Sequence, residues 1–162
     1  MQEAWTASTH VLVVDDEALV GLLVADLLRA EDLEVSLAHG GAEALAMARA
    51  QKPDLVVMGW KMPGLCGAEL LQALRLARPG LSVVVFSGYD LTSESLVGPG
   101  DGPEPVSLRK AADLDLLAPT VLGIAATRRL RRQSGNEAAD GPGFLAACAD
   151  LSLLAPLPSK AA

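Results

Sequence analysis

Two adjacent carboxylates, Asp15 and Asp16, directly follow an aliphatic run over residues 10–14. A continuous run of this kind is typical of a strand that is buried on both of its faces. Two carboxylates at the end of such a strand repel each other, and a hard cation such as Mg²⁺, which prefers oxygen ligands, relieves the repulsion. The competing interpretation is that both residues begin the next helix, where the helix dipole stabilises acidic side chains. The pair alone does not decide between a metal site and a helix start.

Two further polar residues, Ser87 and Lys110, stand at the ends of two other apolar segments. Taken singly, Ser87 is typical of a turn before Gly88, and Lys110 is typical of a lysine exposed to solvent. A hydroxyl and an ammonium that face two carboxylates across one crevice suit a phosphoryl site, because together they surround developing oxyanions with a bound cation, a donor and positive charge. Their joint placement at the ends of three predicted strands therefore favours phosphoryl chemistry.

Short aliphatic segments that alternate with longer helical patterns must position these residues. Strands are predicted over residues 10–14, 33–38, 54–58, 81–86 and 105–108, and helices over residues 17–30, 41–52, 68–77, 91–97 and 113–130. Pro119 must bend or split the last helix, or mark its first turn. Five strands that alternate with helices imply right-handed crossovers and a parallel sheet.

The predicted fold class is therefore α/β, a flavodoxin-like doubly wound five-stranded parallel sheet of order 2-1-3-4-5 with helices on both faces. In this order the sheet changes direction between strands 1 and 3. A crevice is expected there, at the carboxyl ends of the strands, and it would contain Asp15, Asp16 and the residues that follow Met58.

Six short segments in order resemble the receiver domain of two-component response regulators. They are residues 11–17 (VLVVDDE), 41–45 (GAEAL), 53–58 (PDLVVM), 62–64 (MPG), 84–89 (VVFSGY) and 108–110 (LRK). The resemblance spans residues 9–127. It implies that Asp15 and Asp16 bind Mg²⁺ and that Ser87 and Lys110 contact a phosphoryl group.

The acceptor position of the family falls on Gly59, where the resemblance leads us to expect an aspartate. Glycine has no carboxylate to attack a phosphohistidine or to help hold Mg²⁺, so we expect weak Mg²⁺ binding and an ion pair between Lys110 and Asp15 or Asp16. Asp54 is no substitute, because four intervening residues place it about 13–17 Å away along the strand. Gly59 indicates either that nothing is required at this strand end or that another backbone approaches closely.

Three other positions also depart from the pattern of the family. Ala111 replaces the usual proline after the lysine, Ser107 replaces the aromatic switch residue, and Cys66 replaces an aspartate that would cap a helix. The leading hypothesis is a receiver-like protein of a phosphorelay, not an enzyme, that binds protein partners without phosphorylation. One alternative is a phosphorylatable receiver that a mutation of the acceptor has inactivated. A small flavodoxin-like enzyme or nucleotide binder is disfavoured, because no glycine-rich loop follows the first strand.

Composition sets the remaining expectations. The 162 residues carry a formal net charge of −7, which argues against nucleic acid as a partner. The chain has only two cysteines, too few for a disulfide framework. The longest uncharged stretch is too short to cross a bilayer, and the start does not resemble a signal peptide, so we expect a cytoplasmic protein that does not enter the membrane. The expected partners are a histidine kinase or a downstream signalling protein, and a homodimer is left open.

The expected domains are a receiver-like domain at residues 9–127 and a segment at residues 128–162 that ends a basic helix and continues as a flexible tail. The basic run at residues 128–132 is expected to end the last helix, where cations complement the dipole. Residues 144–157 are leucine-rich but too few for a DNA-reading output domain. We expect them either to dock on the domain as a short helix or to be disordered.

Overall fold

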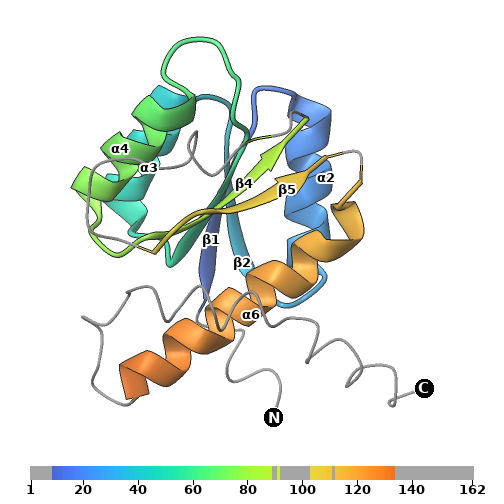
Figure 1. Ribbon diagram of the computed structural model, residues 1–162, viewed down its shortest axis with the longest axis vertical. Coiled ribbons are helices and arrows are strands. Elements are labelled where there is room, and N and C mark those ends of the chain that lie inside the picture. Colours follow the sequence, from blue (N-terminus) through green and yellow to red (C-terminus); the bar gives the residue numbers. More distant parts are fainter. Residues whose placement is uncertain (1–8, 89–90, 92–102, 111, 134–162) are drawn as a thin grey trace.

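Five parallel strands form one sheet in the order β2-β1-β3-β4-β5 (Figure 1). The computed structural model describes residues 9–88, 91, 103–110 and 112–133. The strands are β1 (His10–Val14), β2 (Glu34–Ala38), β3 (Leu55–Met58), β4 (Ser82–Ser87) and β5 (Val106–Arg109). This order and the parallel pairing confirm the predicted fold class.

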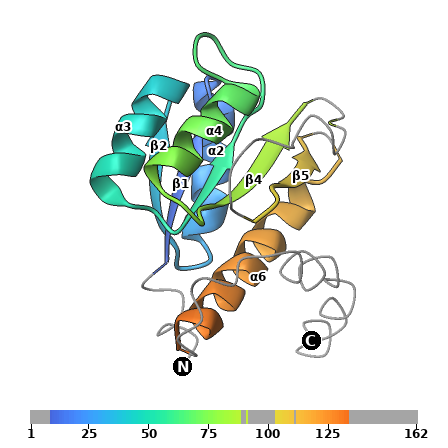
Figure 2. The ribbon, with the colours of Figure 1, turned by 60° about the vertical axis from the view of Figure 1, so that its left-hand side comes forward.

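In the described part of the chain, four helices cover the two faces of this sheet (Figures 1 and 2). They are α2 (Ala18–Arg29), α3 (Gly41–Gln51), α4 (Gly67–Ala77) and α6 (Leu114–Gln133). The helices α2 and α6 pack on one apolar cluster, and α3 and α4 pack on the other. The expected helix over residues 91–97 lies almost wholly outside the described residues, and the expected helix in the tail lies outside them entirely.

The aliphatic runs of the sequence supply both faces of the sheet. Val11 and Val13 of β1 belong to the cluster under α2 and α6, whereas Leu12 and Val14 belong to the cluster under α3 and α4. Because successive residues of a strand point to opposite faces, a strand covered on both sides needs apolar residues at every position. The same requirement accounts for the continuous run of Leu55–Met58 in β3.

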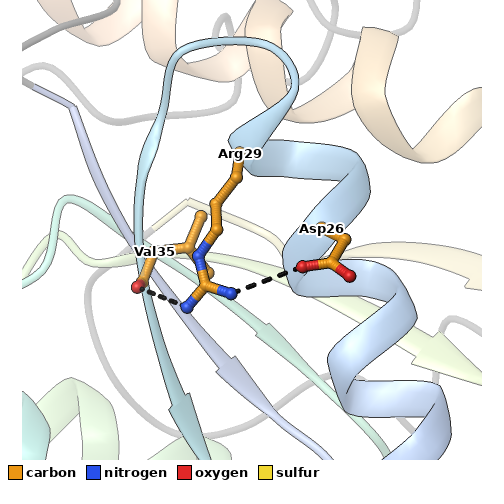
Figure 3. A network of polar contacts seen from close by, with 3 residues as sticks. All are labelled: Asp26, Arg29 and Val35. Atoms are coloured by element: carbon orange, nitrogen blue, oxygen red, sulfur yellow. Dashed lines mark hydrogen bonds and ion pairs between the residues drawn. The ribbon is translucent and has the colours of Figure 1, made fainter.

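An arginine ties the end of α2 to the edge strand β2 (Figure 3). The guanidinium of Arg29 donates to the carbonyl oxygen of Val35 at 3.3 Å and lies 3.5 Å from a carboxylate oxygen of Asp26. The ion pair with Asp26 is exposed, so its contribution to the free energy of unfolding is small. The bond to Val35 satisfies a backbone carbonyl at the edge of the sheet.

The last helix differs from the prediction. It continues through Pro119 as a single helix from Leu114 to Gln133, so Pro119 neither splits it nor begins it. The basic run at residues 128–132 lies in the last turns of α6, so the prediction that it ends the last helix is confirmed. Within it, the guanidinium of Arg128 donates to the carbonyl of Gly80 at 2.7 Å and to the hydroxyl of Ser82 at 3.0 Å, at the start of β4. None of the described helices is both long and apolar enough to cross a bilayer.

Candidate functional site

Asp15 lies at the carboxyl end of β1, and only 3% of its surface is exposed. Its backbone N–H donates to the carbonyl of Ala38 at 3.1 Å, which fixes it beside the end of β2. Its carboxylate oxygen Oδ1 accepts a bond from the backbone N–H of Glu17 at 2.9 Å. The helix α2 begins only at Ala18, so neither Asp15 nor Asp16 lies in its first turn. The helix-start interpretation therefore does not describe their position.

Lys110 reaches the same carboxylate from the other side of the crevice. Its Nζ lies 2.8 Å from Oδ2 of Asp15 and 3.7 Å from Oε1 of Glu17. Its backbone N–H donates to the carbonyl of Ser87 at 2.8 Å, which places the ends of β4 and β5 side by side. The predicted ion pair is therefore present, and its acidic partner is Asp15.

Ser87 and Gly59 complete the same edge of the sheet. Ser87 is the last residue of β4 and is buried. Gly59 directly follows β3 and donates its N–H to the carbonyl of Val14 at 2.9 Å, one residue before Asp15. The carboxyl ends of β1, β3, β4 and β5 thus bring all the predicted site residues to one rim, as the topology of a doubly wound sheet requires.

Three consecutive acidic residues offer a cluster of oxygen ligands at this rim. One carboxylate oxygen each from Asp15, Asp16 and Glu17 lies within 4.8 Å of the others, and the last two residues are exposed. Carboxylate oxygens suit Mg²⁺, so the donor set fits the ion. Sequence reasoning assigned no role to Glu17, although its place directly after two aspartates was a usable signal.

The surroundings of Gly59 do not require a glycine. A Cβ at this position would lie 3.8 Å from the side chain of Met62 and 3.8 Å from the carbonyl oxygen of Val14, which are ordinary contact distances. Gly59 is also not among the residues with a positive φ. The interpretation that a close backbone approach requires glycine here is therefore wrong, because a Cβ fits at this strand end.

Two further predictions about residues near the site are confirmed. Asp54 lies at the opposite end of β3, where its carboxylate accepts a bond from the backbone N–H of His10, the first residue of β1, at 2.9 Å. It therefore cannot serve the rim at Asp15. Cys66 occupies the N-cap of α4 and makes no side-chain capping bond, so the helix lacks the cap that an aspartate would supply.

Comparisons with known proteins place this geometry in a family. The profile of the response regulator receiver domain matches residues 11–97. The probable transcriptional regulatory protein TcrX of Mycobacterium tuberculosis is 38% identical over 98 residues, which cover 60% of this chain and 42% of TcrX. The chain spans about half the length of the curated relatives that it matches.

Solved structures agree with this assignment. The receiver domain of Francisella response regulator 1452 superimposes with a TM-score of 0.65 at 27% identity, covering 74% of this chain and 98% of that one. The response regulator TrrA of Thermotoga maritima, solved in complex with Mg²⁺-BeF, gives a TM-score of 0.59 at 27% identity, covering 72% and 98% of the two chains. The profile match, the strand order and these superpositions together show that the chain belongs to the response regulator receiver domain family of two-component systems and has its CheY-like fold.

Proposed function

We propose that this receiver domain acts in a phosphorelay as a protein-interaction module that works without phosphorylation. The observation that carries the proposal is Gly59, which directly follows β3 beside Asp15, at the position that the resemblance gives to the phosphoryl acceptor. A glycine offers no carboxylate to form an acyl phosphate. Response regulators are signalling proteins, and we expect this chain to act through protein contacts rather than through turnover of a substrate.

The ion pair at the rim is consistent with this proposal, because the Nζ of Lys110 lies 2.8 Å from Oδ2 of Asp15. A ligand shifts a conformational equilibrium only by its difference in affinity for the two states. With no acceptor at position 59, a kinase cannot attach a phosphoryl group that would favour one conformation over the other. The domain therefore keeps the surface that its partners recognise.

Asp15 and Asp16 are the residues that would hold Mg²⁺, and Glu17 lies within reach of the same ion. Bound Mg²⁺ would neutralise the acidic cluster and polarise a phosphoryl oxygen. We propose that its binding is weak for two reasons. Gly59 adds no carboxylate, and Lys110 already occupies Oδ2 of Asp15, so the ion must compete with an ammonium for that oxygen.

A histidine kinase or a downstream signalling protein is the partner that we propose, in the cytoplasm and without membrane contact. The net charge of −7 disfavours a nucleic-acid contact by this domain. TcrX is named as a probable transcriptional regulator, and this chain covers less than half of it. We therefore expect no nucleic-acid contact from the receiver domain that the two proteins share, and this expectation does not extend to the rest of TcrX.

The test is incubation of the chain with acetyl phosphate and Mg²⁺, followed by intact mass spectrometry. We expect no adduct on the present chain. Gly59→Asp supplies the carboxylate and is the positive control. Gly59→Asn has nearly the same shape but no nucleophilic carboxylate, and it is the negative control. An adduct on Gly59→Asp and none on Gly59→Asn verifies that the assay detects phosphorylation at position 59. A stable adduct of one phosphoryl group on the present chain would overturn the proposal.

The Gly59→Asp variant also distinguishes a receiver that a single mutation inactivated from a domain adapted to work without phosphorylation. If a single acceptor mutation inactivated an ordinary receiver, Gly59→Asp should accept a phosphoryl group from its cognate kinase at a rate typical of receivers. If the domain is adapted to work without phosphorylation, transfer to Gly59→Asp should stay slow, because Ser107 and Ala111 also depart from the family pattern.

A further inference from the structure

Three leucines form an apolar patch on the outer face of α2. Leu19, Leu22 and Leu23 are exposed by 83%, 47% and 48%, and their spacing of three and four residues places them side by side on the helix. Val24 and Leu28, which pack on the sheet, lie on the opposite face of α2. Exposed apolar side chains that gather in one place mark an interaction surface, whereas scattered ones do not. We call these three residues the α2 leucine patch.

The α2 leucine patch has a clear boundary. Asp26 and Arg29 continue the same outer face toward the end of α2, where they form an exposed ion pair (Figure 3). The other exposed large apolar side chains among the described residues are Leu76 on α4 and Leu116 and Leu130 on α6. The two on α6 are about 21 Å apart along the helix, so they do not form a patch together. In the part of the chain that the structure describes, only α2 gathers three of these leucines.

A segment of matching character follows α6 in the chain. Residues 144–157, which lie outside the described residues, are mostly apolar and contain one charged residue, Asp150. Their spacing is typical of an amphipathic helix, and the side chains that would share one face are Phe144, Cys148, Leu151 and Leu154. Asp150 would lie to one side of that face, so no charge would be buried against a partner surface. A helix of this kind binds an apolar surface through residues spaced by three and four.

We propose that residues 144–157 bind the α2 leucine patch of the same chain, as a short helix packed on α2. The contact would remove leucine side chains of both partners from water, which favours association. A segment joined through a short linker has an effective concentration on the order of millimolar. It therefore occupies the α2 leucine patch ahead of a second copy at micromolar concentration. A protein that binds this face of α2 must first displace the segment.

The two parts lie within reach of each other. The helices α2 and α6 pack on the same face of the sheet, so the chain need not cross it. Arg128 bonds to Gly80 and Ser82 at the start of β4, so α6 ends at the edge of the sheet opposite to the α2 leucine patch. The path back is about the length of β4 and the last turn of α6, roughly 25–30 Å. The linker at residues 134–143 spans up to about 33–36 Å when extended, which is enough.

The native Cys148 allows a direct test in the whole chain. In a background of Cys66→Ser, Leu23→Cys places a second thiol in the α2 leucine patch. Dilute protein treated with oxidised glutathione should form a disulfide between position 23 and Cys148 within one chain, detected by peptide mapping without reduction. Leu76→Cys on α4 is the matched control and should not form one. Equal yields at positions 23 and 76, or no disulfide at position 23, would overturn the proposal. Disulfides that join two chains would assign the patch to a second copy and would also overturn it.

Hydrogen exchange measures the contact without a cross-link. Amides of residues 144–155 should exchange at least about threefold more slowly than in a free peptide of the same sequence. Leu19→Glu combined with Leu23→Glu should remove this protection, because charges replace the apolar contacts, whereas Leu76→Glu should not. Thermal melts check that the variants fold. Exchange at the rate of the free peptide in the present chain contradicts the proposal. So does protection that survives the changes on α2, or that rises with protein concentration.

Discussion

The Nζ of Lys110 and the Oδ2 of Asp15 are 2.8 Å apart, so one ion pair joins β1 to β5 across the two strands that separate them in the sheet. The aspartate is buried and the lysine is about a quarter exposed. The pair lies beside Asp16 and Glu17, and the ammonium is also 3.7 Å from Oε1 of Glu17, so it faces a cluster of three carboxylates. Removal of the ammonium must therefore change both the stability of this rim and its affinity for cations.

Lys110→Met should lower the free energy of unfolding by about 1–3 kcal/mol in EDTA, because it leaves a buried carboxylate without its counter-charge. Mg²⁺ should then bind more tightly than in the present chain and recover part of this loss. Urea unfolding with and without Mg²⁺ measures both effects. Lys110→Arg, which keeps the charge, is the control and should show neither. Equal Mg²⁺ affinity in Lys110→Met and the present chain would mean that Lys110 does not compete for the site.

Gly59→Ala should leave the fold intact and stabilise it by up to about 1 kcal/mol. A glycine has more conformational freedom to lose on folding than an alanine, and the added Cβ meets only atoms at 3.8 Å. Thermal or urea unfolding measures the change. A loss of stability would show that the strand end needs the glycine for a reason other than space.

The positions of Asp15, Ser87 and Lys110 at one rim could be predicted from the sequence, because the carboxyl ends of parallel strands meet at one edge of a sheet whatever their separation along the chain. The course of the last helix through Pro119 could not, because a proline in a helical pattern allows a bend, a split or a first turn. The bonds of Arg128 to Gly80 and Ser82 could not either, because their partners are 48 and 46 residues away and leave no local pattern. The role of Glu17 was predictable in part, because it directly follows the two aspartates, but the sequence does not show which way its side chain points.

Gly41→Ala should destabilise the protein by about 3 kcal/mol or more. A Cβ on Gly41 would lie 1.9 Å from the backbone oxygen of Leu65, so α3 or the loop between β3 and α4 would have to move. Gly40→Ala is the matched control, because nothing lies within 4 Å of its Cβ. Its cost should be about 1 kcal/mol or less, set by the weaker capping of α3 by alanine.

The same pair of variants should differ in fluorescence. Trp60 lies in the loop between β3 and α4 and packs against Gly67, so movement of that loop changes its surroundings. In a background of Trp5→Phe, the emission of Gly41→Ala should shift and that of Gly40→Ala should not. Identical unfolding midpoints and spectra for the two variants would contradict the close packing of Leu65 on α3.

Arg75 of α4 holds the segment that leads into β5, and its replacement tests how that segment is fixed. The guanidinium is buried and donates to the carbonyl of Pro103, while its Nε has no hydrogen-bond partner among the described residues. Burial lowers the pKa of Arg75, and the nearby charge of Glu104 partly opposes that effect. A base whose pKa is lowered by folding destabilises the folded state while it is charged. The cost of removing the Arg75 guanidinium from water therefore offsets part of the free energy that its hydrogen bond to Pro103 contributes.

Arg75→Met keeps most of the apolar stem and removes the charge, so it should cost only about 1 kcal/mol. Arg75→Ala also removes the packing of the stem and should cost about 2–4 kcal/mol. Glu104→Gln leaves the buried charge uncompensated and should lower stability slightly, by a few tenths of a kcal/mol, because Glu104 is exposed. Urea unfolding at neutral pH ranks the three variants. If Arg75→Met costs as much as Arg75→Ala, the hydrogen bond to Pro103 rather than the packing of the stem holds the start of β5.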